Sequence, residues 1–325
     1  MPNRPTDLAV LCVAAVWGSS YLAMKAIAGP DTVFAVLTVR FAIAAAALLI
    51  VLSRRLRALT KAEVASGAVG GILLAAVCAC ETYGVTQTSA SNAGLIMALT
   101  VVATPILQRS AVAPRFYVAG ALAMVGCGLL TQAGGWAVPG TGDMVVAAAA
   151  LLRAVHVVTM ARLSVAREID PARTTLVQLV TVAAVSMVLT GASGQSVGAL
   201  MTTLNPAQWV LTCYLALACT VFAFLIQLRA LATASPARVS LLLGTEPLWA
   251  AVIGVTLAGD AVTVAGFAGA VLVLTGTGWG RAILTPVTDA QAPDTRRGRP
   301  GSPRRRRSAD RRTAAGTTDR RLCSP

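Results

Sequence analysis

Long apolar segments recur along most of the chain, separated by short connections that contain Gly, Pro, Asn or Asp. Most of these segments approach the length of about 20 residues that an α-helix needs to cross the hydrocarbon core of a bilayer. We therefore predict an all-α integral membrane protein with ten transmembrane helices, at residues 8–27, 33–52, 64–84, 90–108, 116–131, 143–162, 174–191, 207–228, 236–257 and 262–282.

The composition agrees with this pattern. Hydrophobic residues occupy 56% of the 325 positions and charged residues only 12%, whereas a soluble globular protein has roughly 25% charged residues. A water-soluble fold of this size would need more charged side chains to cover its surface. The chain is therefore expected to fold in a lipid bilayer.

The charges of the connections predict the orientation. The outer connections, at residues 28–32, 85–89, 132–142, 192–206 and 258–261, contain no Lys or Arg. The alternate connections and the adjoining helix ends carry all of the following basic residues: Arg54, Arg55, Arg57, Lys61, Arg109, Arg115, Arg162, Arg167, Arg173, Arg229 and Arg238. Basic residues are retained on the cytoplasmic side of a membrane. We predict a multi-pass protein of the cell (inner or plasma) membrane with both termini in the cytoplasm.

The last part of the chain, residues 285–325, has a different composition. It is polar and rich in Arg, Pro, Gly, Ser and Thr, and four consecutive arginines occupy residues 304–307. Such a segment cannot bury enough apolar surface to fold by itself. We predict a disordered cytoplasmic tail. A solvated tail is the simpler interpretation, and a basic arm that contacts anionic lipid or nucleic acid is the alternative.

The two halves of the apolar region carry similar segments in the same order. Residues 87–93 lead into the predicted fourth helix, which contains Pro105, and residues 232–237 lead into the predicted ninth, which contains Glu246 and Pro247. Because each half has an odd number of helices, the second copy would be inverted across the membrane. We predict two inverted five-helix repeats, residues 1–132 and 133–284.

Several short motifs follow one another along the chain: Trp17-Gly18-Ser19-Ser20-Tyr21 with Lys25, Arg40-Phe41, Thr88-Ser89-Ala90-Ser91-Asn92-Ala93-Gly94, Gly142-Asp143 and Leu242-Leu243-Gly244-Thr245-Glu246-Pro247. With them, residues 8–282 resemble the EamA-type members of the drug/metabolite transporter superfamily. The resemblance implies a ten-helix fold in two repeats and the movement of small metabolites, amino-acid-like solutes or drugs across a membrane, often as export.

One spacing departs from the repeat. Pro105 precedes Gly120 by 15 positions, whereas Pro247 precedes Gly266 by 19. About one helical turn is therefore missing from the first half. The depth that the predicted fourth helix reaches in the membrane depends on this missing turn.

Ionisable side chains inside a membrane are costly and therefore mark functional sites by default. The candidates away from the predicted cytoplasmic connections are Lys25, Arg40, Glu81, Arg153, His156 and Glu246. Lys25 lies near a helix end, from which its ammonium group can reach the interface. Glu81 is a candidate substrate contact or proton-coupling carboxylate, and a structural partner for Arg40 or Lys25 is the alternative.

Arg153 and His156 are three positions apart on the predicted sixth helix, at a position that corresponds to Trp17–Ser20 in the first repeat. Residues with this spacing are neighbours on a helix. An arginine beside a histidine suggests recognition of a carboxylate-bearing substrate, and His156 would titrate near neutral pH. A buried polar pair that holds helices together is the alternative.

Glu246 and Pro247 form the strongest candidate pair. A proline releases a backbone carbonyl from helical hydrogen bonding and bends the helix, so Pro105 and Pro247 are predicted kinks. A carboxylate beside an interrupted helix is typical of the binding or coupling site of a transporter. A purely structural kink is the alternative.

Aromatic and small polar residues complete the predicted site. Trp17, Tyr21, Tyr214 and Trp249 are candidates to line a cavity. Two small polar residues of the motifs join them as candidate substrate contacts, Ser20 and Asn92. Tyr83, Trp136 and Trp209 are instead candidates for the aromatic belt at the membrane interface.

We predict a secondary transporter for a small-molecule substrate, with protons as a candidate coupling ion and a homodimer as a candidate assembly. The chain has no Gly-x-x-x-x-Gly-Lys motif for ATP. It has one histidine and no zinc-like cysteine spacing, so we expect no metal, no cofactor and no catalytic residue. A membrane enzyme is one alternative, although the Gly-x-Ser-x-Gly and His-Glu-x-x-His motifs are missing. A non-transporting scaffold that works through its basic tail is the other.

Overall fold

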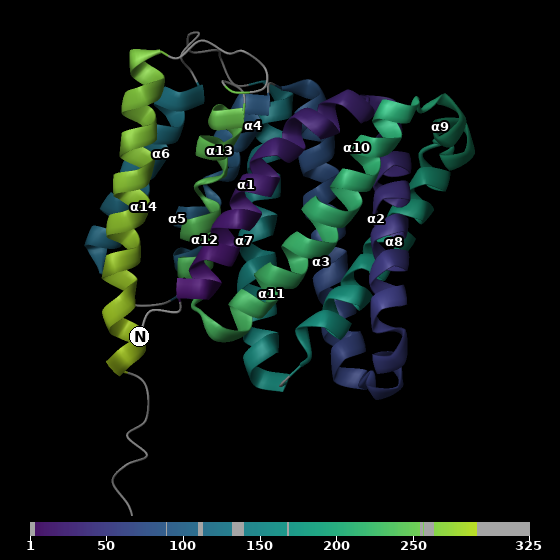
Figure 1. The fold of residues 1–325 in the computed structure, drawn as a ribbon, viewed down its shortest axis with the longest axis horizontal. Helices are drawn as coiled ribbons and strands as arrows, with labels where there is room; N and C mark the ends of the chain where they lie inside the picture. The colour runs from purple at the N-terminus through teal and green to yellow at the C-terminus, as the bar shows by residue number, and fades with distance from the viewer. Residues whose placement is uncertain are drawn as a thin grey trace, which may run out of the picture.

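The computed structural model describes residues 4–88, 90–109, 113–131, 140–167, 169–253, 256 and 263–290, and every regular element in this part of the chain is a helix. Figure 1 shows the helices standing side by side as one layered bundle, with α6 and α14 at one side and α2 and α8 at the other. The central helices α1, α7 and α12 lie between these pairs.

The helices follow one another along the chain with short connections between them, as the apolar segments predict. Their bounds are α1 Arg4–Ile27, α2 Val33–Leu52, α3 Lys61–Gln87, α4 Ala90–Met97, α5 Thr100–Gln108, α6 Pro114–Thr131, α7 Thr141–Arg167, α8 Pro171–Ala192, α9 Val197–Thr203, α10 Pro206–Ala216, α11 Ala223–Thr233, α12 Pro236–Leu243, α13 Glu246–Ile253 and α14 Val264–Ala290. Short helical turns η1 Pro30–Thr32 and η2 Ser53–Ala58 flank α2, and a π-helix, η3 Leu217–Phe222, joins α10 to α11.

Six helical stretches of the described chain are long and apolar enough to cross a membrane: Pro5–Ile27, Val33–Ala58, Lys61–Gln87, Thr141–Arg167, Pro171–Ala192 and Pro206–Thr233. Shorter apolar helices occupy Pro114–Leu129 and Val264–Gly280. The all-α membrane character of the chain is therefore confirmed, with these six helices as the clear spans.

Three of the predicted helices are interrupted, one of them by the π-helix η3 and the other two by turns. The predicted fourth helix is divided into α4 and α5 at Ala98 and Leu99, where backbone bonds tighten to the i→i+3 spacing, as in Leu99 N–H to Ile96 O at 3.0 Å. The predicted ninth is divided into α12 and α13 at Gly244 and Thr245. Pro247 lies in the first turn of α13, where its missing N–H costs no helical hydrogen bond. Pro105 instead lies inside α5.

Other helix boundaries also differ from the prediction. The short helix α9 lies in a connection for which we predicted no helix, and α14 continues to Ala290 rather than ending at residue 282. Hydropathy marks where apolar residues stop, whereas polar residues can continue the helical hydrogen bonding. The remainder of the predicted tail, residues 291–325, lies outside the described residues, as does Trp136.

Local capping fixes where α3 and α8 begin. Thr60 and Glu63 form a capping box at the start of α3, and Asp170 caps α8 by accepting from the N–H groups of Ala172 and Arg173. Glu63 also pairs with Arg173, at 2.6 Å between Oε1 and Nη2, and accepts from the Asp170 N–H. This ion pair joins the starts of α3 and α8.

Small residues allow α6 and α14 to pack closely at one side of the bundle (Figure 1). A Cβ added to Gly126 would lie 2.6 Å from the Gly269 carbonyl oxygen, and one added to Gly276 would lie 2.7 Å from that of Ala119. The two backbones are therefore in direct contact, which is the usual arrangement of small residues between membrane helices.

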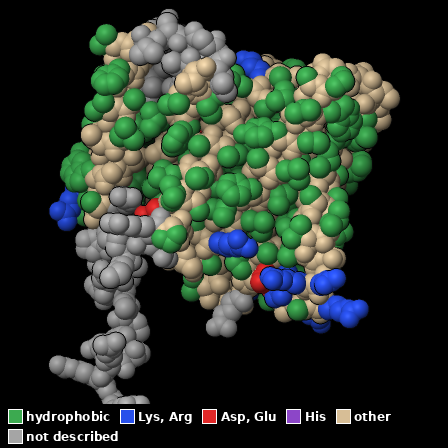
Figure 2. Space-filling view, viewed as in Figure 1, with side chains coloured by type: hydrophobic (Ala, Val, Ile, Leu, Met, Phe, Trp, Pro, Cys, Tyr) green, Lys and Arg blue, Asp and Glu red, His purple; other side chains and the backbone are tan. Residues whose placement is uncertain are grey.

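The lateral surface is apolar. Large side chains such as Ile50, Val51, Val188 and Phe267 are between 68% and 77% exposed. Figure 2 shows one face covered mainly by hydrophobic side chains, with most of its visible Lys and Arg gathered toward the lower end, where α1 begins. Such a surface suits contact with lipid rather than with water, as expected for a multi-pass membrane protein.

Candidate functional site

A three-residue charge cluster lies where α3, α7 and α13 meet. Arg153 of α7 donates from Nη2 to Glu81 of α3 at 2.9 Å and from Nη1 to Glu246 of α13 at 3.3 Å. The side chains are 11%, 18% and 5% exposed, in the order Arg153, Glu81 and Glu246. The partner of Glu81 is thus Arg153 rather than Arg40 or Lys25, the two alternatives raised by the sequence.

Trp17 of α1 supports the cluster from one side. The Arg153 guanidinium lies 4.8 Å from the centroid of the Trp17 ring, at the distance of a cation–π contact. The indole Nε1 of Trp17 donates to the Cys219 carbonyl at 2.9 Å, and its ring packs against Phe224 at 5.5 Å between centroids. The ring that faces Arg153 is therefore held in place by two elements, η3 and α11.

Gly18 brings α1 against α13 beside this cluster. A Cβ at Gly18 would lie 2.7 Å from the carbonyl oxygen of Glu246 and 2.8 Å from the backbone nitrogen of Ala250. Only a residue without a side chain allows this approach. The backbone that carries Glu246 is therefore seated directly on α1.

Buried polar atoms remain unpaired next to the cluster. The Tyr21 hydroxyl and Glu246 Oε1 are both buried, and neither has a hydrogen-bond partner among the described residues. The Ser20 hydroxyl, by contrast, donates to the carbonyl of Trp17 at 2.8 Å. Buried polar groups are nearly always satisfied in proteins. Tyr21 and Glu246 nevertheless lie close enough to interact with each other, so both oxygens belong to the buried polar part of the cluster.

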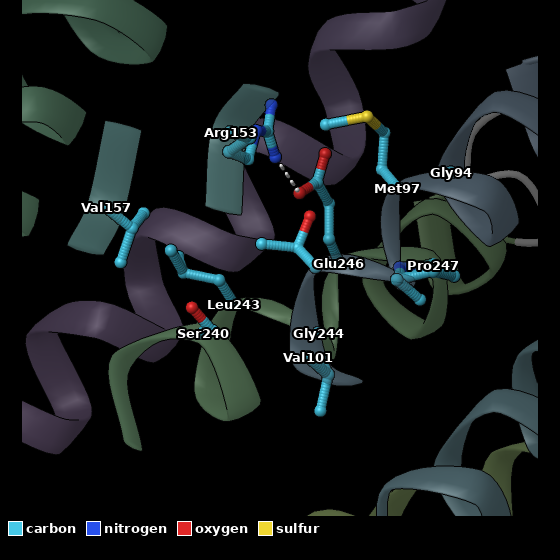
Figure 3. Close-up of a pocket in the computed structure, with 12 residues that line it drawn as sticks. Gly94, Met97, Val101, Arg153, Val157, Ser240, Leu243, Gly244, Glu246 and Pro247 are labelled. Atoms are coloured by element: carbon cyan, nitrogen blue, oxygen red, sulfur yellow. Dashed lines mark hydrogen bonds and ion pairs between the residues drawn. The ribbon is translucent and has the colours of Figure 1, made fainter. Parts of the chain in front are cut away.

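Two small cavities flank Arg153, which lines both. One has a volume of about 30 Å³, and its lining includes Trp17, Ser20, Tyr21, Arg40, Glu81 and Phe224. The other has a volume of about 10 Å³, and its lining includes Gly94, Met97, Val101, Ser240, Glu246 and Pro247. Figure 3 shows the second cavity, with Arg153 and Glu246 pointing toward each other across it.

The volumes of the two cavities show how large a molecule each of them can hold. About 10–15 Å³ holds one water molecule, whereas pockets for drug-sized ligands measure about 300–1,000 Å³. The cluster is therefore closed, and a metabolite could reach it only after neighbouring helices separate.

His156 does not join the cluster. Its Nε2 forms a hydrogen bond with Gln178 Oε1 of α8 at 2.9 Å, and its side chain is buried. It lines neither of the two cavities. The predicted pairing of Arg153 and His156 as one recognition surface is therefore not seen in this structure. The histidine instead links α7 to α8 through Gln178.

The remaining candidates lie around the cluster. Tyr214 is hydrogen-bonded to Ser19 of α1 and lines neither cavity. Trp249 lies against Gly18, and its Nε1 is buried without a partner among the described residues. Lys25 is exposed and donates to the Thr88 carbonyl at 3.0 Å. Asn92 lies on α4, but its side chain is outside the described part.

Some lining residues carry no sequence signal. Met97 is an ordinary apolar residue of α4. Ser240, which forms a 2.9 Å hydrogen bond with Thr104, lies on α12 within an apolar run. The sequence likewise gives no signal for Asp7, because this residue precedes the first predicted helix. It nevertheless forms a buried ion pair with Arg238 of α12, at 2.7 Å between Oδ2 and Nη2.

No group of three or more His, Cys, Asp or Glu side chains that could hold a metal ion occurs in the part of the chain that the structure describes. The acidic pair of the cluster is occupied by Arg153. The charged groups that the structure brings together at the site are one guanidinium and two carboxylates.

The chain matches the EamA-like transporter family over residues 4–132 and 140–279. One solved crystal structure is similar in fold, with a TM-score of 0.69 over 87% of this chain and 99% of that chain, at 16% sequence identity. No protein with a curated description matches.

Proposed function

The chain belongs to the EamA-like transporter family, which matches it in two parts, and from this premise we propose a secondary transporter that moves a small organic solute across the cell membrane. The resemblance noted in the sequence is thereby confirmed. The family is one of transporters. We propose export as the direction, and metabolites, amino-acid-like solutes or drugs as the solute class.

The ten-helix arrangement is part of this proposal. Counting α4 with α5, α10 with α11, and α12 with α13 as single interrupted spans gives ten spans in total. The apolar parts of α6 and α14, Pro114–Leu129 and Val264–Gly280, are shorter than the six clear spans. Residues 1–132 then hold five spans and residues 133–284 hold the other five. With an odd number in each, the second repeat is inverted.

The observation that carries the proposal is the charge cluster of Arg153, Glu81 and Glu246. It joins the two proposed repeats, since Glu81 belongs to the first and the other two residues to the second. Charged groups deep within membrane helices mark transport paths. The break between α12 and α13 lies next to Glu246. It supports the same interpretation, because interrupted helices form many transporter sites.

Alternating access would require contacts between the repeats to break at each end in turn. At the end where α1 begins, Asp7 pairs with Arg238, and Glu63 pairs with Arg173. At the opposite end, Thr88 donates to Asp143 and Gln208 donates to the Ala26 carbonyl. We propose that the end where α1 begins faces the cytoplasm. The two ion pairs would then close the cytoplasmic side.

We expect Glu246→Gln to reduce transport at least about tenfold, because a charge-assisted hydrogen bond contributes about 1.5–3 kcal/mol. The carboxamide keeps the shape of the side chain and removes its charge. A counterflow assay in liposomes, after a metabolite and drug panel in knockout and overexpressing cells, measures the effect. Asp31→Asn is the matched control, since Asp31 is an exposed carboxylate in η1. Unchanged transport by Glu246→Gln would show that the site is elsewhere.

Removal of residues 291–325 distinguishes a transporter from a scaffold that works through its basic tail. We expect the shortened chain to transport at the rate of the full chain, because α14 remains intact through Ala290. The same liposome assay gives the rate, and size-exclusion chromatography checks that the shortened chain is folded. Loss of transport in a folded, shortened chain would favour the scaffold.

A further inference from the structure

Arg40 of α2 is a buried cation without an ionic partner. It is 7% exposed. Four arginines of the described chain are not exposed, and three of them, Arg153, Arg173 and Arg238, each pair with a carboxylate. Among the described residues Arg40 forms no ion pair. A buried charge without an ionic partner is costly. The terminal nitrogens of Arg40 are not among the fully enclosed unpaired atoms of the described residues, so a group from outside the packing can reach them.

The π-helix η3 holds Arg40 by one atom only. The Thr220 hydroxyl donates to the Leu215 carbonyl at 2.8 Å and accepts from Arg40 Nε at 2.9 Å. This is the only hydrogen bond of Arg40 within the described residues. The guanidinium carbon lies 5.3 Å from the centroid of the Phe41 ring. One edge of the guanidinium is therefore fixed, while its two terminal amino groups have no described acceptor.

Arg40 also lines the larger of the two cavities, together with Glu81, Arg153 and Tyr21. The cavity thus has a free cation at one part of its wall and the Arg153 ion pairs at another. π-Helical turns are frequent at functional sites. A planar guanidinium with two free amino groups is suited to grip two oxygens of one group.

We propose that Arg40 binds the carboxylate group of the transported solute and that Thr220 positions it for this contact. The inference rests on the proposed transport function and assigns its anion-binding residue. A cationic group would be repelled by Arg40.

The charge balance favours a carboxylate over a phosphate. Arg40 and Arg153 balance Glu81 and Glu246 in the closed state. A doubly charged phosphate would leave a surplus of two negative charges beside the two glutamates. A carboxylate leaves a surplus of one, and an ammonium group on the same solute or an accompanying proton cancels it.

Four matched probes test the assignment: butanoate, butanamide, 2-aminobutanoate and 2-aminobutanamide. They have one carbon skeleton and differ only in the acid or amide group and in the amine. Binding to the full chain in lipid nanodiscs is measured by isothermal titration calorimetry, and transport by counterflow in liposomes. We expect the wild type to bind the two acids more tightly than the two amides.

Arg40→Gln is expected to weaken acid binding at least about tenfold while leaving amide binding nearly unchanged. Thr220→Ala should weaken acid binding less, because it removes only the positioning contact. Arg229→Gln is the matched control, since Arg229 is exposed on α11. If Arg40→Gln does not fold, Arg40→Lys and Thr220→Ala carry the test, and both should reduce the preference for acids over amides.

Equal weakening of acids and amides in these variants would overturn the assignment and leave Arg40 a structural charge. A wild type that shows no preference for acids, or binds none of the probes, would overturn it as well. Failure of the proposed function has a different signature, namely acid binding by the wild type without any counterflow.

Discussion

Replacement of Arg153 by alanine is expected to abolish transport and to destabilise the protein by about 3–5 kcal/mol, the cost of leaving buried charges without their partner. Arg153 is the only described partner of Glu81 in an ion pair, and the same holds for Glu246. The variant would place two unneutralised carboxylates near each other inside the bundle. It would also remove the cation from the face of Trp17.

Two measurements check this expectation. Thermal unfolding in mild detergent reports the stability, and counterflow in liposomes reports the transport. Arg162→Ala is the matched control on the same helix, because Arg162 is exposed and has only a 3.5 Å contact to the Leu107 carbonyl. An Arg153→Ala variant that unfolds and transports like Arg162→Ala would contradict a central role for the cluster.

A triple variant separates stability from function. Arg153→Ala combined with Glu81→Gln and Glu246→Gln removes the cation together with both anions. We expect this variant to regain much of the stability that the single variant loses, since no unpaired charge remains buried. Its transport should stay absent, because the groups proposed to bind the solute or the coupling ion are gone. Recovery of transport would show that the charges serve folding alone.

The sequence identifies the members of this cluster but not their pairing. Arg153, Glu81 and Glu246 stand out because charges are rare within apolar segments. Their contacts span 72 and 93 positions of the chain, and no local pattern encodes such distances. The sequence therefore suggested Arg40 or Lys25 as the structural partner of Glu81, whereas the placement of the helices identifies Arg153.

Helix geometry explains why the predicted pairing of Arg153 with His156 is not seen. Residues three apart are adjacent along a helix surface, yet their directions differ by about 60° because one turn contains 3.6 residues. Arg153 therefore points to α3 and α13, while His156 points to Gln178 of α8. The spacing makes the two residues neighbours along one helix, but it does not determine which helix each side chain faces.

Interrupted helices show a second limit of sequence interpretation. Hydropathy treats residues 90–108, 207–228 and 236–257 as continuous apolar segments, and apolar residues remain apolar when the hydrogen-bonding register changes. Pro247 gave a local signal for the break before α13. The π-helix at Leu217–Phe222 had no such signal, so the contact between Thr220 and Arg40 could not be predicted.

Gly18→Val is the second substitution with a large expected effect, because Gly18 is the contact point between α1 and α13. Even the first carbon of a side chain would lie 2.7 Å from the Glu246 carbonyl oxygen and 2.8 Å from the Ala250 nitrogen, and both are backbone atoms that cannot rotate away. The two helices must then separate. Overpacking of this kind costs about 1–3 kcal/mol, occasionally more.

The functional loss should exceed the loss of stability, since the displaced backbone carries Glu246. Separation of α1 from α13 moves this carboxylate away from Arg153 on α7 and from Trp17, the neighbour of Gly18 on α1. We expect Gly18→Ala to slow counterflow and Gly18→Val to abolish it, in a graded series. Gly278→Ala on α14 is the control, because a Cβ there has no neighbour within 4 Å. If Gly18→Val transports as well as Gly278→Ala, close seating of α13 on α1 is not required for the transport cycle.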